Sequence, residues 1–214
     1  MTRINPFSLR IVLGLSVCCC SLNAVNSAAQ PIDARGFQLS STAVGNGKPL
    51  PLSAVNNILV NDVNTCTADG AAGGNKSPPL FWAHVPRRTR SFVVTLFDLT
   101  ASFTHWGIYN IAGNATGLPS NAGAVGSTVG KQIYNDFGNS GYGGPCPPHN
   151  LEPDAHRYIF TVYALDTPLE LPLQANFPTF SGTLYQALLL HALGGHILGK
   201  SSLLFTYSST PAGH

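Results

Sequence analysis

The chain has 214 residues, 9% of them charged, and a formal net charge of +2 at neutral pH. This length accommodates one domain of ordinary size together with a removable leader. The low and nearly balanced charge argues against a nucleic-acid partner, because binding to phosphate backbones requires clustered lysine and arginine side chains.

The first 29 residues contain the three parts of a secretory signal peptide. Arg3 and Arg10 precede an apolar run at 11–20, and small residues follow as far as Ala29. This order predicts export and cleavage after Ala29. The apolar run is too short to span a bilayer, so we expect no transmembrane anchor in the mature chain.

The domain that remains after cleavage comprises residues 30–214. The leader at 1–29 contains two of the eleven basic residues and none of the nine acidic ones, so the mature domain is formally neutral. We expect this domain in the periplasm or outside the cell. Attachment to lipid through Cys18, which ends a loose match to a bacterial lipobox, is an alternative that Val17 fits poorly.

Two cysteines, Cys66 and Cys146, remain in the mature domain. In an oxidising compartment an isolated pair is a disulfide candidate, and two free buried thiols are the alternative. The sequence contains no CxxC or HExxH pattern, and two distant thiols do not complete a zinc site. We therefore expect neither a metal nor another cofactor.

The segment 30–79 contains short candidate strands separated by loops. Residues 37–39 and 57–60 have the composition of strands, and Leu50-Pro51-Leu52 is typical of a sheet edge. Residues 71–79 are rich in glycine, alanine and proline, which predicts a loop.

A stronger strand signal begins at residue 80. Residues 80–85 predict a strand and 86–89 a turn. The following run at 91–99 has almost no polar interruption, which is typical of a strand covered on both faces, and it ends beside Asp98. A further strand is expected at 103–111.

The second half of the chain adds a long excursion, one more central strand and a helix. Residues 113–130 are rich in glycine, alanine and serine, and loops of this length are usually functional or mobile. We expect a strand at 157–165, a helix at 183–198 capped by Thr183, and a returning strand at 202–207. The leucines expected to face the core are Leu184, Leu188, Leu189 and Leu193.

Many short strands with one or two late helices indicate a mainly β protein. The helices that parallel strands would require between them are missing, so a β-sandwich of two antiparallel-rich sheets is favoured over a parallel α/β sheet.

A loop at 139–148 has a composition that excludes a helix, because it combines three glycines with three prolines. Backbone N–H groups in such glycine turns can converge on an anion. The loop carries Tyr142 and leads to His156 and Tyr158, which favours a binding pocket. A rigid connection between two strands is the alternative.

Polar side chains at strand ends and in this loop form the candidate site. They are Asp98, His105, Tyr142, His156 and Tyr158. Strand alternation places His156 and Tyr158 on one face of their strand, and His105 and Gly107 on one face of theirs. If the strands are neighbours, both imidazoles open toward one cavity, in which we expect Asp98 to orient His105.

These residues resemble the phosphatidylethanolamine-binding protein family, in particular its bacterial branch, the Raf kinase inhibitor-like proteins. The resemblance extends from about residue 37 to 207 and implies a Greek-key β-sandwich with a small anion pocket near one end of the larger sheet. The segments that carry the resemblance are 75–82, 98–106, 141–148 and 156–158. The predicted ligand-binding residues are Asp98, His105, Tyr142, Gly144, Pro148, His156 and Tyr158.

The chain departs from the family pattern after Asp98. Where the family reads Asp-Pro-Asp-x-Pro, residues 98–102 read Asp-Leu-Thr-Ala-Ser. The missing second carboxylate should make the pocket less repulsive to an anion. The missing prolines should make its mouth less rigid.

We therefore expect an exported, non-catalytic protein that binds phosphate or a phosphorylated head group. A regulatory protein that acts through contact with a protein partner, such as a kinase or hydrolase inhibitor, is the first alternative. A histidine-based hydrolase or metal enzyme is the second. The serines near the motifs lie outside a GxSxG elbow, so no catalytic residue is assigned.

Overall fold

The structure is a computed structural model that describes residues 36–45, 47–149, 151–171 and 180–210. The expected signal peptide and its cleavage site lie outside these ranges. Within the described residues, no helix is long and apolar enough to cross a membrane.

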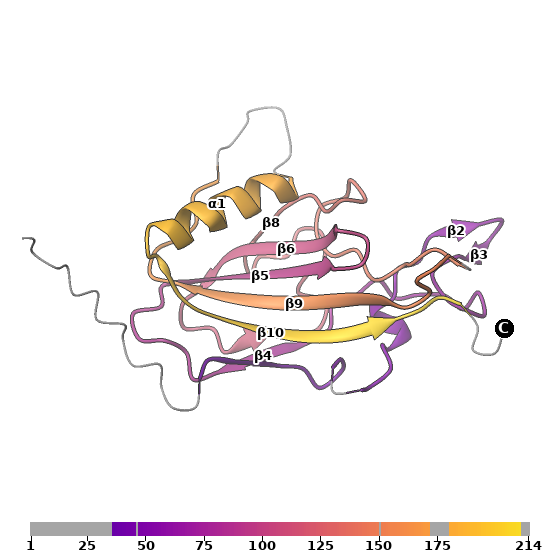
Figure 1. Ribbon diagram of the computed structural model, residues 1–214, viewed down its shortest axis with the longest axis horizontal. Coiled ribbons are helices and arrows are strands. Elements are labelled where there is room, and N and C mark those ends of the chain that lie inside the picture. The colour runs from indigo at the N-terminus through magenta and orange to yellow at the C-terminus, as the bar shows by residue number, and fades with distance from the viewer. Residues whose placement is uncertain (1–35, 46, 150, 172–179, 211–214) are drawn as a thin grey trace, which may run out of the picture. The chain divides into compact units, whose positions relative to one another are not determined.

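The larger sheet has five antiparallel strands in the order β10-β9-β5-β6-β8 (Figure 1). Its strands are β5 (Ser91–Asp98), β6 (Phe103–Ala112), β8 (Lys131–Gln132), β9 (His156–Leu165) and β10 (Ile197–Tyr207). The apolar run predicted as a doubly covered strand is β5, which lies at the centre of this sheet and is buried along almost its whole length.

The smaller sheet has three antiparallel strands with β4 in the middle. Its strands are β1 (Gln38–Ser40), β4 (Leu80–Ala83) and β7 (Gly117–Leu118). A separate pair consists of β2 (Leu59–Val60) and β3 (Val63–Asn64). The proline-containing edge segment predicted at residues 50–52 is not a strand, because Leu52 begins a short 3-10 helix, Leu52–Ala54, with Pro51 at its N-cap.

The hydrophobic core has two layers because alternate residues of β5 face opposite sides. Phe92, Val94 and Leu96 point toward the smaller sheet, where Trp82 packs against Phe92 at a ring distance of 4.9 Å. Val93 belongs to the other cluster, beneath the helix α1. Figure 1 shows α1 and β4 on opposite faces of the larger sheet. The predicted mainly β sandwich with a late helix is confirmed.

Helix α1 (Ser181–Leu193) starts two residues before the predicted Thr183 cap, and its N-cap residue makes no side-chain capping bond. It ends at the predicted glycine pair, with Gly195 at φ 74°. Leu189 and Leu193, expected in the core, are 59% and 76% exposed. They lie five and nine residues beyond the buried Leu184, which turns them by about 140° and 180° around the helix axis.

Candidate functional site

Three strand ends meet at one end of the larger sheet. β5 ends at Asp98, whose register partners are Phe103 at the start of β6 and Tyr158 near the start of β9. His156 is the first residue of β9, and its ring stacks on that of Tyr158 at 6.3 Å. The topology thus brings four of the predicted residues together: Asp98, His105, His156 and Tyr158.

The Asp98 carboxylate is 2% exposed and uses both of its oxygens within the protein. Oδ1 accepts hydrogen bonds from the backbone N–H groups of Thr100 (2.8 Å) and Ala101 (3.0 Å). Oδ2 accepts from His156 Nδ1 at 2.6 Å. The turn that lacks the family's prolines is therefore braced by hydrogen bonds to Asp98, and Thr100 Oγ1 accepts a further bond from the Arg157 N–H (2.9 Å).

The expectation that Asp98 orients His105 is wrong, because Asp98 is paired with His156. His105 Nδ1 instead donates to the carbonyl oxygens of Gly143 (2.8 Å) and Gly144 (3.2 Å). Since a carbonyl only accepts, the proton resides on Nδ1 and the neutral ring presents a lone pair at Nε2. His105 Nε2 makes no hydrogen bond to the described residues and is not among the fully buried unpaired atoms.

Aromatic rings surround the His105 imidazole. The ring centroids of Phe103, Tyr158 and Phe137 lie 5.0, 5.2 and 5.3 Å away. Burial lowers the pKa of His105 below its ordinary value of 6.5, and the accepting carbonyls and the charge of Asp98 oppose this only in part. The imidazole is therefore held neutral at neutral pH.

A β-bulge gives His105 its direction. Leu96 is in register with Trp106, but the next residue, Phe97, is in register with Thr104, so His105 is the extra residue. A bulge re-aims the side chain that it adds. The prediction that His105 and Gly107 share one face is wrong, because Gly107 faces Ile133 and Leu184 on the helix side of the sheet. The bulge turns the imidazole toward Tyr158, on the side that faces the smaller sheet.

Tyr158 carries an unpaired polar atom in the middle of this cluster. Its hydroxyl is buried and has no hydrogen-bond partner among the described residues. Burial raises its pKa, and the nearby Asp98 carboxylate raises it further, by its charge and as an acceptor close to the hydroxyl. The hydroxyl is therefore a protonated donor, and the neighbouring Asp98 carboxylate already accepts hydrogen bonds at both of its oxygens. An unsatisfied buried group costs about 1–3 kcal/mol, so such an atom points to a ligand or water position.

The prediction that the N–H groups of the glycine loop bind an anion is wrong for residues 141–144, because these groups donate within the protein. The N–H groups of Gly141, Tyr142 and Gly143 donate to the carbonyls of Ile133, Gly123 and His105 at 3.2, 2.9 and 2.9 Å. The N–H of Gly144 donates to Asn75 Oδ1 at 2.8 Å. The loop is therefore a braced wall that contributes carbonyl oxygens to His105.

No hydrogen bond or ring contact joins Tyr142 or Pro148 to the four clustered residues within the described part of the chain. The Tyr142 hydroxyl donates to the Ala54 carbonyl at 2.8 Å, and its ring packs edge-on against Trp106 at 5.7 Å. Tyr142 is thus part of the core, with its polar group already satisfied. Pro148 lies at the exposed edge of the loop, two residues beyond Cys146.

Position 144 requires glycine because of the space around it. It does not require a left-handed conformation, which occurs in this loop at Gly141, with φ 92°. A Cβ atom on Gly144 would lie 2.3 Å from the Ala54 carbonyl oxygen and 2.6 Å from the Asn56 nitrogen. These are backbone atoms, which cannot move aside as a side-chain end can.

Replacing Gly144 with alanine is therefore expected to lower the free energy of unfolding by about 1–3 kcal/mol, and valine should cost more. Urea unfolding would measure the effect. Gly182→Ala is the control, because a Cβ atom there meets nothing within 4 Å. Equal stability of Gly144→Ala and Gly182→Ala would contradict the close packing of the loop.

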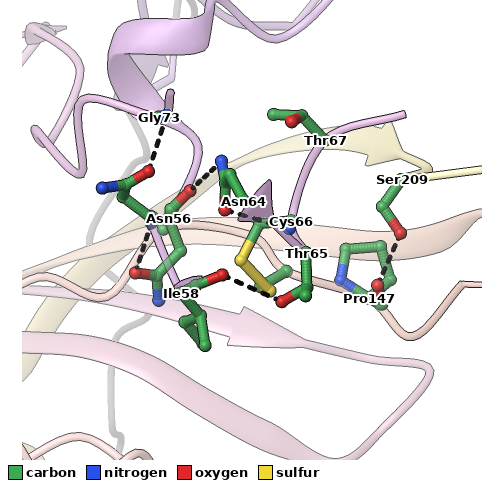
Figure 2. The surroundings of a disulfide bond; sticks show 12 residues. Asn56, Ile58, Asn64, Thr65, Cys66, Thr67, Gly73, Pro147 and Ser209 are labelled. Carbon is green, nitrogen blue, oxygen red and sulfur yellow. Dashed lines mark hydrogen bonds between the residues drawn. A yellow bond between two sulfur atoms is a disulfide. The ribbon is translucent and has the colours of Figure 1, made fainter. Parts of the chain in front are cut away.

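A disulfide anchors the far end of the loop (Figure 2). Cys66 and Cys146, for which the sequence left free thiols as an alternative, are joined with an S–S distance of 2.04 Å. Hydrogen bonds surround this link. Ser209 Oγ donates to the Pro147 carbonyl (2.6 Å), and the Tyr207 hydroxyl donates to the Cys66 carbonyl (2.7 Å). The chain around β3 and the site loop are thus held together covalently and by hydrogen bonds.

Sequence reasoning missed three residues that shape the site. Phe103 and Phe137 form the aromatic walls of His105, and Asn75 supports the loop at Gly144. Asn75 and Phe103 lie in or beside motifs that were identified. Phe137 lay unnoticed just before the glycine loop, because an aromatic residue in a loop carries no distinctive pattern.

Among the described residues, no group of three or more His, Cys, Asp or Glu side chains could hold a metal ion. The metal-enzyme alternative therefore gains no support from the described part of the chain.

Comparison with known proteins identifies the family to which this chain belongs. A model of the family described as phosphatidylethanolamine-binding protein matches residues 40–208. A "UPF0098 protein" of Methanothermobacter thermautotrophicus is 39% identical over 140 residues, which is 63% of this chain and 84% of that protein. "UPF0098 protein YbcL" of Escherichia coli is 37% identical over 151 residues, 67% of this chain and 75% of that one.

Solved structures agree with these matches. The crystal structure of E. coli YbcL, described as a member of the mammalian PEBP family, superposes with a TM-score of 0.61 and 32% identity, covering 80% of this chain and 98% of that one. A homologue from Chlamydia trachomatis gives a TM-score of 0.57 with 28% identity over 80% of this chain and 97% of that one. The chain therefore belongs to the phosphatidylethanolamine-binding protein family.

Proposed function

We propose that this protein is an exported, non-catalytic binding protein whose site takes a small anion, either phosphate or a phosphorylated head group. The observation that carries the proposal is the unpaired, buried hydroxyl of Tyr158, whose ring lies against the two imidazoles of His105 and His156. The family's own description, as a binder of a phospholipid with a phosphorylated head group, supports the same ligand chemistry.

The available groups are suited to a small anion. The Tyr158 hydroxyl donates, and each imidazole has its Nδ1 occupied, by Asp98 or by the loop carbonyls, so that Nε2 is left for a ligand. A protonated Nε2 donates to an anion. Asp98 has both oxygens engaged, and it acts by holding His156 in position.

Export is supported by two features of the chain. The segment 1–29 has the pattern of a signal peptide. The Cys66–Cys146 disulfide belongs to an oxidising compartment, because the cytosol keeps such pairs reduced.

Titration with dimethyl phosphate tests the anion site. Tyr158→Phe removes only the unpaired hydroxyl, so we expect affinity to fall about 10–100-fold while the unliganded protein becomes no less stable. Calorimetry measures the first quantity and thermal unfolding the second. Tyr142→Phe is the matched control for binding, because that hydroxyl is used by Ala54. Unchanged affinity in Tyr158→Phe, or no binding by the parent, would refute the proposal.

The affinity should also depend on pH in one direction. His105 has a lowered pKa and is neutral at pH 7.5, whereas a bound anion favours the imidazolium, so binding takes up a proton. We expect affinity to rise from about pH 7.5 to about pH 5.5, by at most about tenfold per unit for one proton. A phosphodiester probe is chosen because its own charge does not change in this range.

His105→Gln is the control for this pH effect, because glutamine cannot take up the proton. The variant should bind more weakly and show a flatter pH profile. An equally steep profile in His105→Gln would assign the proton uptake to other groups and contradict the role given to His105.

A further inference from the structure

A cavity borders the glycine loop. It has a volume of about 640 Å³ and is lined by four segments, 56–58, 74–76, 121–125 and 135–143. Volumes of about 300–1,000 Å³ are typical of small-molecule sites. Asp98, His105, His156 and Tyr158 do not line this cavity, so it is separate from the anion cluster.

Three asparagines of this cavity have their amide groups oriented by the backbone. The Oδ1 atoms of Asn56, Asn57 and Asn75 accept from the N–H groups of Asn57 (2.8 Å), Gly73 (3.2 Å) and Gly144 (2.8 Å). Since a backbone N–H only donates, the oxygen of each amide must face it, and each NH₂ group is left over. None of these three NH₂ groups has a hydrogen-bond partner among the described residues.

The charge of the cavity is positive. Lys76 lines it, no aspartate or glutamate does, and the ion pairs of the described residues do not include Lys76. The cavity therefore presents three preset donors and one cation, which suits a ligand that is rich in acceptors and carries a negative charge.

The remaining residues that line the cavity are partly apolar, and partly carry amide groups that can both donate and accept hydrogen bonds. Phe137 and the exposed side chains of Ile58 and Val125 supply the apolar part. Asn121 and Asn139 are exposed and make no side-chain hydrogen bond within the described part of the chain. Hydroxyl groups match such amides, because both donate and accept. A ligand with C–H faces, hydroxyls and one carboxylate fits all three properties.

We propose that this cavity binds a small sugar acid, with its carboxylate at Lys76 and its hydroxyl oxygens at the amide groups of Asn56, Asn57 and Asn75. This site is additional to the anion cluster. The two sites share a wall. Gly143 lines the cavity while its carbonyl oxygen accepts from His105, and Phe137 lines the cavity while its ring lies 5.3 Å from that of His105.

Titration of the purified protein with D-glucuronate tests the proposal, with D-glucose as the neutral analogue of the same shape. We expect glucuronate to bind and glucose to bind at least about tenfold more weakly, because a charge-assisted bond is lost. Lys76→Met removes the charge and keeps most of the aliphatic stem. Asn57→Asp keeps the oxygen that accepts from Gly73 and replaces the donor with a carboxylate oxygen. Each should reduce glucuronate affinity about 10–100-fold.

Two further measurements separate this site from the anion cluster. Tyr158→Phe should leave glucuronate affinity unchanged, and Asn57→Asp should leave dimethyl phosphate affinity unchanged, which also shows that the variant is folded. The proposal is overturned if glucuronate does not bind, if glucose binds as tightly, or if Lys76→Met and Asn57→Asp bind glucuronate as the parent does. Loss of glucuronate binding in Tyr158→Phe would place that ligand in the anion cluster instead.

Discussion

Replacing Cys66 and Cys146 together with alanine is expected to lower the free energy of unfolding by about 4 kcal/mol. The disulfide closes a loop of 80 residues, and a cross-link that restricts so long a segment of the unfolded chain contributes about this amount. Urea unfolding of the parent and the double variant measures the difference. A reductant should destabilise the parent to a similar extent and leave the double variant unchanged.

Anion binding should survive the loss of the disulfide at temperatures where the variant is folded, with affinity reduced less than about tenfold. The loop keeps its bonds from the Gly144 N–H to Asn75 and from the Asn56 N–H to the Pro145 carbonyl (3.2 Å). Equal stability of the parent and the double variant would show that the cysteines do not stabilise the fold. Complete loss of binding by a folded double variant would instead make the disulfide a positioning element of the site.

The second large effect concerns the buried pair of Asp98 and His156. Replacing His156 with leucine removes the partner of a carboxylate that is 2% exposed, and we expect a loss of about 3 kcal/mol. Adding Asp98→Asn should restore part of this loss, because asparagine carries no charge and its Oδ1 can still accept from Thr100 and Ala101. The double variant should therefore be more stable than His156→Leu alone.

Urea unfolding of the parent, both single variants and the double variant measures the coupling between the two residues. His196 and Asp166 form a matched exposed pair, with an Nδ1–Oδ1 distance of 3.0 Å and side chains 49% and 25% exposed. His196→Leu should cost about 0–1 kcal/mol. The prediction is contradicted if the losses in free energy of unfolding of the two single variants simply add in the double variant. It is also contradicted if His156→Leu costs no more than His196→Leu.

Elements with a local signal were predicted well from the sequence. The apolar run at 91–99 is β5, and the glycine pair after residue 193 ends α1. Hydrophobic periodicity and glycine conformation depend on neighbouring residues in the chain, so they can be read without knowing the fold. Even so, two of the four leucines assigned to the core of α1 are exposed, because the width of the buried stripe depends on what the helix packs against.

The residues of the candidate site could be predicted from the sequence, but their hydrogen-bond partners could not. The sequence indicated Asp98, His105, His156 and Tyr158, and the three strand ends bring them together. It paired Asp98 with the wrong histidine, and it assigned anion binding to N–H groups that are already bonded. Both errors concern partners contributed by other segments of the fold, which a local sequence pattern does not identify.

The sequence by itself determined the mainly β class, the family resemblance and the residues that carry the chemistry, because composition, periodicity and motifs are properties of the chain. Only the tertiary structure decided what these residues do. The extra residue in β6 turns His105 toward Tyr158, and the packing of Gly144 against the backbone of Ala54 requires a glycine without a left-handed conformation. Pairing register and close backbone contact arise between segments far apart in the chain, so they exist only once the sheets have formed.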